Sequence, residues 1–275
     1  MTRWSRSLFS AALILAIALV VVGCSAGTEE TFQGGAPGET TGPVGLVDEE
    51  ITVASNIAYP PFEFSPRHGP EGFDIDLMNE IADRVGFEVE YENVPFDELL
   101  RGLNTELYDV AISAMTITSA REQQVDFSDP YFNADQCLLV ASYSDVESVD
   151  DLAEATVGVQ LGTAGQIEVQ ALINAERVGR GVTFRTIEDA FAALQAGQVE
   201  GVIYDLAAAQ AAVEESDGRL RIVETVPTGD QYGIAFPQDS ALVEPVNEAL
   251  AEIKADGTYE EIYERWIGLP PEEIP

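Results

Sequence analysis

Arg121 is a candidate for chemistry because it follows closely spaced hydroxyl side chains in a chain that has few basic residues. The segment Asp109 to Tyr131 reads DVAISAMTITSAREQQVDFSDPY, and the whole chain has 13 Lys and Arg against 49 Asp and Glu. Hydroxyls, free N–H groups of a turn and a guanidinium fork are the donors that hold a carboxylate. The pattern predicts a site for an anionic group. In the alternative reading, Arg121 pairs with one of the many acidic side chains and the hydroxyls cap a helix.

These residues follow a predicted strand, and the rest of the chain alternates between strands and helices. Apolar residues at helical spacing and short apolar runs between turn residues carry this assignment. We expect strands at Ile51–Ala54, Glu88–Tyr91, Val110–Ser113, Leu138–Ala141, Thr156–Val159, Gly201–Ile203 and Gly233–Phe236. We expect helices at Ile75–Val85, Phe96–Asn104, Ala164–Ala175, Ile187–Ala196, Ala207–Glu214, Val243–Ala255 and Thr258–Trp266. Strands separated by helices of this length predict parallel sheets in an α/β protein.

Seven segments occur in an order that is similar to a known family. They read ITVASNIAYPPFEF, GFDIDL, DVAISAMTITSAR, VGVQLGTAGQ, GQVEGVIYD, YGIAF and EALAEIKADGTYEEIYERWIG. Between Glu50 and Gly268 the chain resembles the extracellular solute-binding proteins of family 3, the receptors of polar amino-acid ABC importers. The resemblance implies the two-lobe periplasmic-binding-protein fold of type II. Each lobe would be a sheet flanked by helices, with residues 50–133 and 231–275 in lobe 1, residues 134–230 in lobe 2, and the ligand in the cleft between them.

The resemblance also implies roles for residues at the end of the Val110–Ser113 strand. Arg121 matches the arginine that clamps the ligand carboxylate, with Thr116 assisting through its hydroxyl and N–H. Ser113 and Ala114 match positions that offer polar or backbone contacts, often to the ligand ammonium, and Ala114 can offer only its backbone.

Lobe 2 is expected to supply the opposite side of the cleft. The segment LGTAG places Thr163 and Ala164 between a strand and a helix, where backbone N–H groups favour an anion. Asp205 ends a predicted strand and matches the aspartate that receives the ligand ammonium. Asp205 also stands where it could cap the following helix, and the two roles are compatible.

The side-chain pocket is predicted from five further residues. Tyr59 and Phe96 match positions where relatives place aromatic or apolar walls, although both could be ordinary core residues. Asn56, Gln160 and Tyr204 are candidates to line the same space. Because Asn56 stands where many relatives that bind basic or amide side chains carry Asp, we expect a polar amino acid with a neutral side chain. A compatible solute such as ectoine is the alternative.

The N-terminus has the pattern of a secretory signal. Residues 1–23 carry two arginines and then a short apolar run, which ends in Val21-Val22-Gly23-Cys24. We expect cleavage before Cys24 and acylation of its thiol, which would anchor the protein to the outer face of the cell membrane. An ordinary signal peptide and an uncleaved anchor are the alternatives. Residues 24–49 are rich in small and polar residues and are expected to form a flexible tether.

The charge limits the classes of partner. Removal of residues 1–23 takes away two of the 13 basic and none of the 49 acidic residues, so the net charge becomes 11 − 49 = −38. Such a protein repels nucleic acid and anionic lipid surfaces. We interpret the acidity, which is spread along the chain, as adaptation to high salt. Drift in an acidic proteome is an alternative, and calcium binding is disfavoured because no loop has EF-hand spacing.

Two rival functions use the same fold. Some relatives are secreted dehydratases that act on cyclic amino-acid precursors, and such chemistry needs a positioned acid or base. The single histidine, His68, lies in a Pro-flanked loop and is expected to be exposed, and no Cys/His metal cluster can be built. A sensor would need a membrane span after Gly268, where only LPPEEIP follows. We therefore expect a monomeric, cofactor-free solute receptor that delivers an amino acid to an ABC permease, not an enzyme.

Overall fold

The computed structural model of the protein describes residues 49–66 and 69–275. The predicted signal segment, Cys24, nearly all of the predicted tether and His68 lie outside the described residues. Within the described part, none of the helices combines the length and the apolar character needed to cross a membrane.

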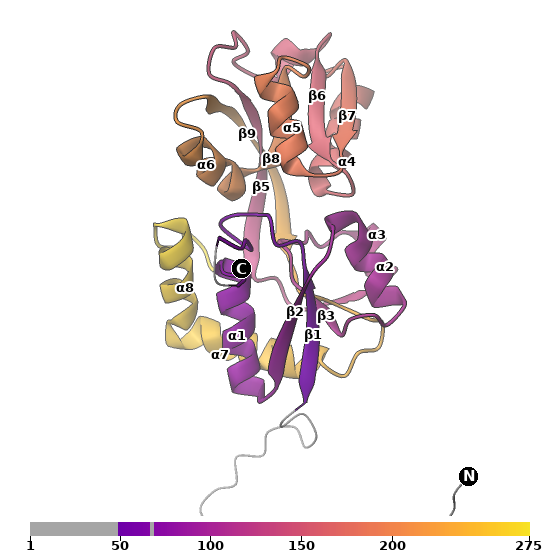
Figure 1. The fold of residues 1–275 in the computed structure, drawn as a ribbon, viewed down its shortest axis with the longest axis vertical. Helices are drawn as coiled ribbons and strands as arrows, with labels where there is room; N and C mark the ends of the chain where they lie inside the picture. Colours follow the sequence, from indigo (N-terminus) through magenta and orange to yellow (C-terminus); the bar gives the residue numbers. More distant parts are fainter. Residues whose placement is uncertain (1–48, 67–68) are drawn as a thin grey trace, which may run out of the picture. The chain divides into compact units, whose positions relative to one another are not determined.

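Two five-stranded sheets organise the described chain (Figure 1). The strand order is β2-β1-β3-β10-β4 in the first sheet and β7-β6-β8-β5-β9 in the second. The strands of the first sheet are β1 (Glu50–Ser55), β2 (Glu88–Asn93), β3 (Val110–Ala111), β4 (Asp126–Phe127) and β10 (Ala235–Phe236). Those of the second are β5 (Phe132–Ala141), β6 (Thr156–Gln160), β7 (Arg180–Phe184), β8 (Gly201–Asp205) and β9 (Leu220–Tyr232). We refer to the first sheet with its helices as lobe 1 and to the second with its helices as lobe 2.

The sheets are mixed, so the prediction of parallel sheets is wrong in part. Strand β1 pairs in parallel with β2 and β3, and β6 pairs in parallel with β7 and β8. Strand β10 is antiparallel to β3 and β4, and β5 is antiparallel to β8 and β9. The exceptions follow the chain path, because β5 and β9 carry the chain between the lobes, β10 follows β9 directly, and none of the three closes a βαβ unit.

Helices cover both sheets. They are α1 (Phe73–Val85), α2 (Leu99–Asn104), α3 (Ser119–Glu122), α4 (Ala164–Asn174), α5 (Ile187–Gln195), α6 (Leu206–Glu215), α7 (Val243–Asp256) and α8 (Thr258–Ile267), with 3-10 turns η1 (Phe96–Glu98) and η2 (Val149–Leu152). Helices α1, α7 and α8 pack together in lobe 1, while α4 and α5 contact β6, β7 and β8 in lobe 2 (Figure 1). The predicted helix Phe96–Asn104 is a 3-10 turn followed by a short α-helix.

Strands β5 and β9 carry the chain between the lobes (Figure 1). They pair in antiparallel fashion from Phe132 opposite Tyr232 to Ala141 opposite Leu220. At the lobe 1 end, Ile117 N–H donates to Gln231 O at 2.8 Å and Tyr131 N–H donates to Tyr232 O at 2.9 Å. These bonds fix the crossing strands to the turn that carries the predicted anion site.

Where the crossing strands meet lobe 1, the buried side chains are mainly aromatic. Phe62 packs edge-on against Phe132 with ring centroids 4.9 Å apart, and Tyr232 stacks on Phe132 at 5.6 Å. Phe73 and Tyr131 extend the same group. By contrast, one core cluster of lobe 2 is wholly aliphatic: Leu138, Val140, Val149, Leu152, Val157, Val159, Val169, Leu172, Val178 and Ile203. Aromatic pairs have preferred geometries that define their relative positions more strictly than aliphatic contacts do.

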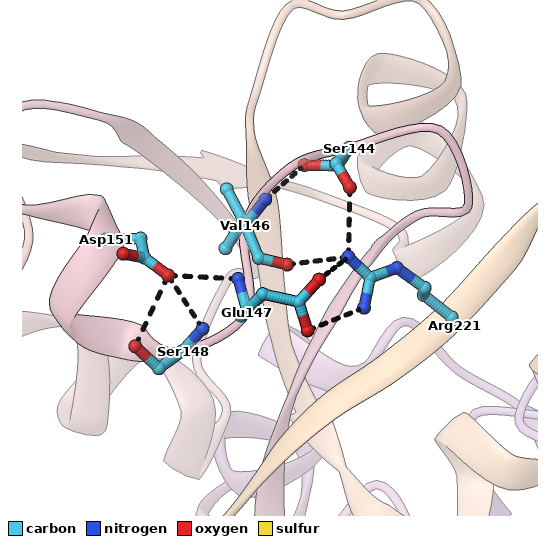
Figure 2. A network of polar contacts seen from close by, with 6 residues as sticks. All are labelled: Ser144, Val146, Glu147, Ser148, Asp151 and Arg221. Atoms are coloured by element: carbon cyan, nitrogen blue, oxygen red, sulfur yellow. Dashed lines mark hydrogen bonds and ion pairs between the residues drawn. The ribbon is translucent and has the colours of Figure 1, made fainter.

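Arg221 of β9 holds the loop that follows β5 in lobe 2 (Figure 2). Its Nη2 donates to Ser144 O at 2.9 Å, to Val146 O at 2.7 Å and to Glu147 Oε1 at 3.1 Å. Asp151 Oδ2 in turn accepts from the N–H groups of Glu147 and Ser148, as part of a capping box at η2. A loop that would otherwise expose its carbonyl groups is thus tied to the sheet.

Candidate functional site

The predicted site residues follow the carboxyl ends of four strands. Asn56 follows β1, Ser113 follows β3, Gln160 ends β6, and Asp205 ends β8. One cavity between the lobes is lined by Asn56, Tyr59, Glu63, Phe96, Ser113, Ala114, Thr116, Gln160, Thr163, Ala164 and Asp205. Ten of the twelve predicted binding residues therefore meet at this place. The cavity volume is about 10 Å³, which is room for about one water molecule, so the lobes must separate before a solute can enter.

Arg121 lies beside this cavity and reaches across the cleft. It is 6% exposed, and its Nη2 donates to Gly162 O of lobe 2 at 2.9 Å while Nη1 donates to Thr116 O of lobe 1. The guanidinium carbon lies 5.4 Å from the centre of the Phe96 ring, in cation–π range. Burial lowers the pKa of Arg121 to about 10, so the side chain is charged at neutral pH.

Arg121 forms no ion pair with any carboxylate among residues 49–66 and 69–275. The alternative reading, in which it pairs with one of the acidic side chains, therefore finds no support there. Thr118, which follows Thr116, does cap the short helix α3 by accepting from Arg121 N–H. The capping role thus falls on a neighbouring hydroxyl and leaves Ser113 and Thr116 at the cavity.

Asp205 occupies the N-cap position of α6 but does not cap it through its side chain. Its carboxylate instead accepts from the hydroxyl of Tyr59 in lobe 1 and from Nε2 of Gln136 in lobe 2. Burial raises the pKa of Asp205, although the bonds from Tyr59 and Gln136 oppose the shift. One donor from each lobe therefore holds the Asp205 carboxylate at the cleft.

Tyr204 does not line this cavity. Its ring packs edge-on behind that of Tyr59, with centroids 5.3 Å apart, and it lines a neighbouring groove with Phe191 and Ala208. Tyr204 therefore supports the Tyr59 wall from behind. On the lobe 2 side, Thr163 precedes α4, and its hydroxyl donates to Gln160 O at 2.9 Å. The first N–H groups of α4 have no partner within the helix.

Ala114 is held in an unusual backbone conformation. Its φ of 43° lies in the left-handed region, which costs energy for a residue with a Cβ. Its N–H donates to Asp74 Oδ2 at 2.7 Å. This hydrogen bond is buried, and Asp74 lies in the first turn of α1. Asp74 therefore stabilises the turn that directs Ser113 and Thr116 toward the cavity.

Two residues at the site were not predicted, Glu63 and Gln136. Glu63 is fully buried, lines the cavity, and accepts a hydrogen bond from Ser113 Oγ at 2.7 Å. Burial and the neighbouring carboxylate of Asp74 raise the pKa of Glu63. The sequence did contain one indication of Glu63, since an acidic residue stands between two phenylalanines in PPFEF. Gln136 lies in a polar stretch, and nothing in the sequence indicated its role.

Among the described residues, no group of His, Cys, Asp and Glu side chains could hold a metal ion. The residues in the cleft offer instead one buried cation, hydroxyl donors, a helix N-terminus and one carboxylate that accepts from both lobes. A zwitterion has the complementary charges. Fold and site together define a two-lobe receptor for a small charged solute.

Comparison with known proteins identifies the family. The model of the bacterial extracellular solute-binding proteins, family 3, matches residues 51–269, and the chain belongs to this family. A probable histidine-binding protein of Neisseria gonorrhoeae is 34% identical over 241 residues, which are 85% of this chain and 89% of that protein. The predicted family and the two-lobe periplasmic-binding-protein fold of type II are thereby confirmed.

Solved structures give the same result. An ancestral arginine-binding protein bound to arginine is 38% identical, with a TM-score of 0.75 over 80% of this chain and 99% of that one. The same kind of protein bound to glutamine is 38% identical, with a TM-score of 0.76 over 81% and 100%. An ancestral amino acid-binding protein described as a precursor of cyclohexadienyl dehydratase is 31% identical, with a TM-score of 0.71 over 79% and 95%.

Proposed function

We propose that this protein is the substrate-binding component of an ABC importer and captures a polar α-amino acid by closure of the two lobes. The buried Arg121 carries this proposal, because its charge has no carboxylate partner among the described residues and lies where strand ends of both lobes meet. An α-carboxylate would replace Gly162 O on the guanidinium, assisted by Thr116, Ser113 and the first N–H groups of α4. The ammonium would replace the Tyr59 hydroxyl on Asp205.

The head-group assignment is tested with ligand analogues. Calorimetry would compare an amino acid with its α-carboxamide on the native protein and on Arg121→Ala. We expect the carboxamide to bind far more weakly to the native protein, and the difference to shrink in the variant because the partner of the carboxylate is gone. An equal penalty in both proteins would contradict the assignment.

For the side chain we propose a neutral polar group. Asn56 and Gln160 supply neutral donors and acceptors, and Tyr59 and Phe96 supply aromatic surface. The ionisable side chains that line the cavity are Tyr59, Asp205 and Glu63, of which Asp205 is assigned to the ammonium and Glu63 has a raised pKa. A thermal-shift panel of the amino acids and of ectoine would test this, since a ligand at about 100 times its Kd adds about 2.7 kcal/mol to stability.

A basic side chain is the second candidate. Relatives named for histidine and arginine are similar over most of the chain, and Glu63 could accept a hydrogen bond from a cation once ionised. Arginine binding with exclusion of glutamine in the thermal-shift panel would favour this candidate over the neutral one.

Enzymatic activity is the remaining alternative. A dehydratase needs a positioned acid, and Glu63 is a buried acid at the cavity. We propose that the protein is not an enzyme, because relatives that it matches over most of its length are named as binding proteins. Incubation with a cyclohexadienyl substrate and chromatography of the products would reveal turnover.

Several further features belong to the same proposal. We propose that residues 50–133 with 231–275, and residues 134–230, move as separate bodies. The mature protein would be a monomer that docks on a permease, binds no nucleic acid, and is held outside the cytoplasm by lipid on Cys24. Mass spectrometry of membrane-extracted protein would detect the lipid, and secretion and anchoring that are unchanged in Cys24→Ser would contradict it.

Adaptation to high salt is also proposed, from the net charge of −38 that follows from 11 basic and 49 acidic residues. Screening shortens the range of repulsion from about 30 Å at 0.01 M to about 3 Å at 1 M ionic strength. A melting temperature that rises with added NaCl would support this proposal, and an unchanged one would contradict it.

A further inference from the structure

Two buried carboxyl groups, Glu63 in the wall of the cavity and Asp74 behind it, lie close together, with no cation between them among the described residues. Glu63 and Asp74 are both 0% exposed. Neither forms an ion pair with a Lys or Arg in the part of the chain that the structure describes. Two buried carboxylates without a counter-ion are strongly unfavourable, so the pair requires an explanation.

The backbone brings the two groups together. The turn before Glu63 packs on the first turn of α1, where Phe73 N–H donates to Pro61 O and Asp74 N–H donates to Phe62 O, each at 2.9 Å. This close approach depends on Gly72, whose φ is 137° and whose added Cβ would lie 2.1 Å from Phe62 O. The juxtaposition of the carboxyl groups is therefore built into the main chain.

One oxygen of each carboxyl group in the pair lacks a hydrogen-bond donor among the described residues. Glu63 Oε1 accepts from Ser113 Oγ at 2.7 Å, and Asp74 Oδ2 accepts from Ala114 N–H at 2.7 Å and from Tyr131 Oη at 2.8 Å. Glu63 Oε2 and Asp74 Oδ1 are buried without a donor among the described residues. Because the donors Ser113 and Ala114 are adjacent residues, the two carboxyl groups lie against the same turn. Ionised carboxylates only accept, so one proton between them supplies the missing donor.

Among residues 49–66 and 69–275, the titratable groups that face the pair add no positive charge. They are phenols and one further carboxylate: Tyr91 of β2, Tyr131 before β5, Tyr204 and Asp205 of β8, Tyr232 of β9 and Tyr259 of α8. Burial raises the pKa of both Glu63 and Asp74, and the donors at Ala114 and Tyr131 oppose the shift at Asp74. These shifts favour the protonated form of Glu63 over that of Asp74.

We propose that Glu63 and Asp74 share one proton, and that this proton determines which ligand side chains the cavity accepts. Glu63 lines the cavity, whereas Asp74 lies behind it. A neutral side chain binds with the proton in place. A cationic side chain instead pairs with ionised Glu63, and the proton passes to solvent. The inference rests on the proposed function, because it concerns the side chain of a bound amino acid.

The proposal predicts opposite pH dependences for two ligands. Binding of a cation releases one proton, so the affinity for arginine should rise about tenfold per pH unit below the pKa of Glu63 and level off above it. The affinity for glutamine should stay constant through the same range. Calorimetry of each ligand in two buffers that differ in ionisation enthalpy would count the released protons, with about one expected for arginine and none for glutamine.

Glu63→Gln is the informative variant because its amide imitates the protonated acid and donates permanently to Asp74. We expect its affinity for arginine relative to glutamine to be at least about tenfold lower than that of the native protein near neutral pH, and we expect it to release no proton with either ligand. Glu71→Gln, at an exposed position in the same loop region, is the matched control and should behave like the native protein. Arginine binding by the native protein without proton release would overturn the proposal.

A measurement without ligand separates this inference from the proposed function. The infrared spectrum of the native protein at neutral pH should contain a protonated-carboxyl band that is missing in Glu63→Gln and shifted in Asp74→Asn. Its absence would overturn the shared proton whatever the protein binds. A band together with failure of every amino acid to bind would contradict the proposed function and the assigned selectivity, while the shared proton itself would stand.

Discussion

The two lobes contribute to the cleft in different ways. Lobe 1 presents side chains that buried partners hold in place: Arg121 on Thr116 O, Ser113 on Glu63, and the Ala114 turn on Asp74. Lobe 2 presents the N-terminal end of α4 and the carboxylate of Asp205, which relies on Gln136 of its own lobe and on Tyr59 of the other. Under the proposed function, lobe 1 would hold a preformed half of the site, which lobe 2 would complete by closure.

Arg121→Ala should reduce ligand affinity more than any other substitution considered, because it removes the central group of the lobe 1 half of the site. Loss of one member of a desolvated charged pair costs about 2–5 kcal/mol, or roughly 30-fold to several-thousand-fold in affinity. Titration calorimetry with the ligand found by the thermal-shift panel measures the effect. Arg101→Ala, at an exposed position of α2, should leave the affinity unchanged. Near-native affinity in Arg121→Ala would refute the assigned half-site.

Asp205→Asn tests lobe 2 and should have the next largest effect. The amide cannot pair with an ammonium as a carboxylate does, and a hydrogen bond to a charged group is worth about 1.5–3 kcal/mol, or roughly 10- to 150-fold in affinity. A ligand analogue without the amino group should lose much less affinity. Asp145→Asn, on an exposed loop of the same lobe, is the control. If both ligands lost affinity equally, Asp205 would have another role.

The carboxyl pair of lobe 1 should make the stability of the native protein depend on pH. Because burial raises the pKa of Glu63, its stabilising proton is fully present below the ordinary glutamate value of about 4.3 and is lost as pH rises through the folded-state value. Each unit of upward shift is worth about 1.4 kcal/mol. We therefore expect the melting temperature of the native protein to fall relative to that of Glu63→Gln with rising pH. Parallel curves would indicate that the pair is not protonated.

The smallest effect is expected for an ion pair at the rim of the cleft. Arg185 of lobe 2 bonds to Glu98 of lobe 1, and its side chain is 57% exposed. Exposed pairs contribute about 0.2–1 kcal/mol, so Arg185→Ala should change the affinity by no more than about fivefold, and less in high salt. Arg180→Ala, exposed on β7, is the control. A change as large as that in Asp205→Asn would mean that the rim, rather than the cleft, holds the lobes together.

The sequence predicted every long helix, and in α1 the buried Leu77 and Ile81 belong to the apolar stripe at helical spacing that indicates it. Strands were predicted less completely. In β7 and β9 most residues are half-buried or exposed, so the apolar runs that mark central strands are missing. Pro227 within β9 is a further signal against a strand. Pairing direction was also missed, because it depends on how the chain returns between the lobes.

The site was predicted mainly through the family resemblance, which assigned positions one by one. Ten of those positions line one cavity, yet Tyr204 lies behind the wall and Glu63 was missed. Local sequence reports where a residue stands on a strand or turn. It does not report that the close approach of Gly72 to Phe62 brings the Glu63 and Asp74 carboxyl groups together. The chemistry of that pair is a tertiary property.

The contacts of Arg121 with Gly162 O and of Tyr59 with Asp205 have a consequence for uptake from dilute solution. A molecule closed in this way cannot accept solute, so the apparent Kd equals the intrinsic Kd divided by the open fraction. If about one molecule in ten were open, the apparent affinity would be about tenfold weaker than the cleft allows. Evolution could therefore retune the concentration range of the importer by altering self-closure while leaving every contact to the solute unchanged.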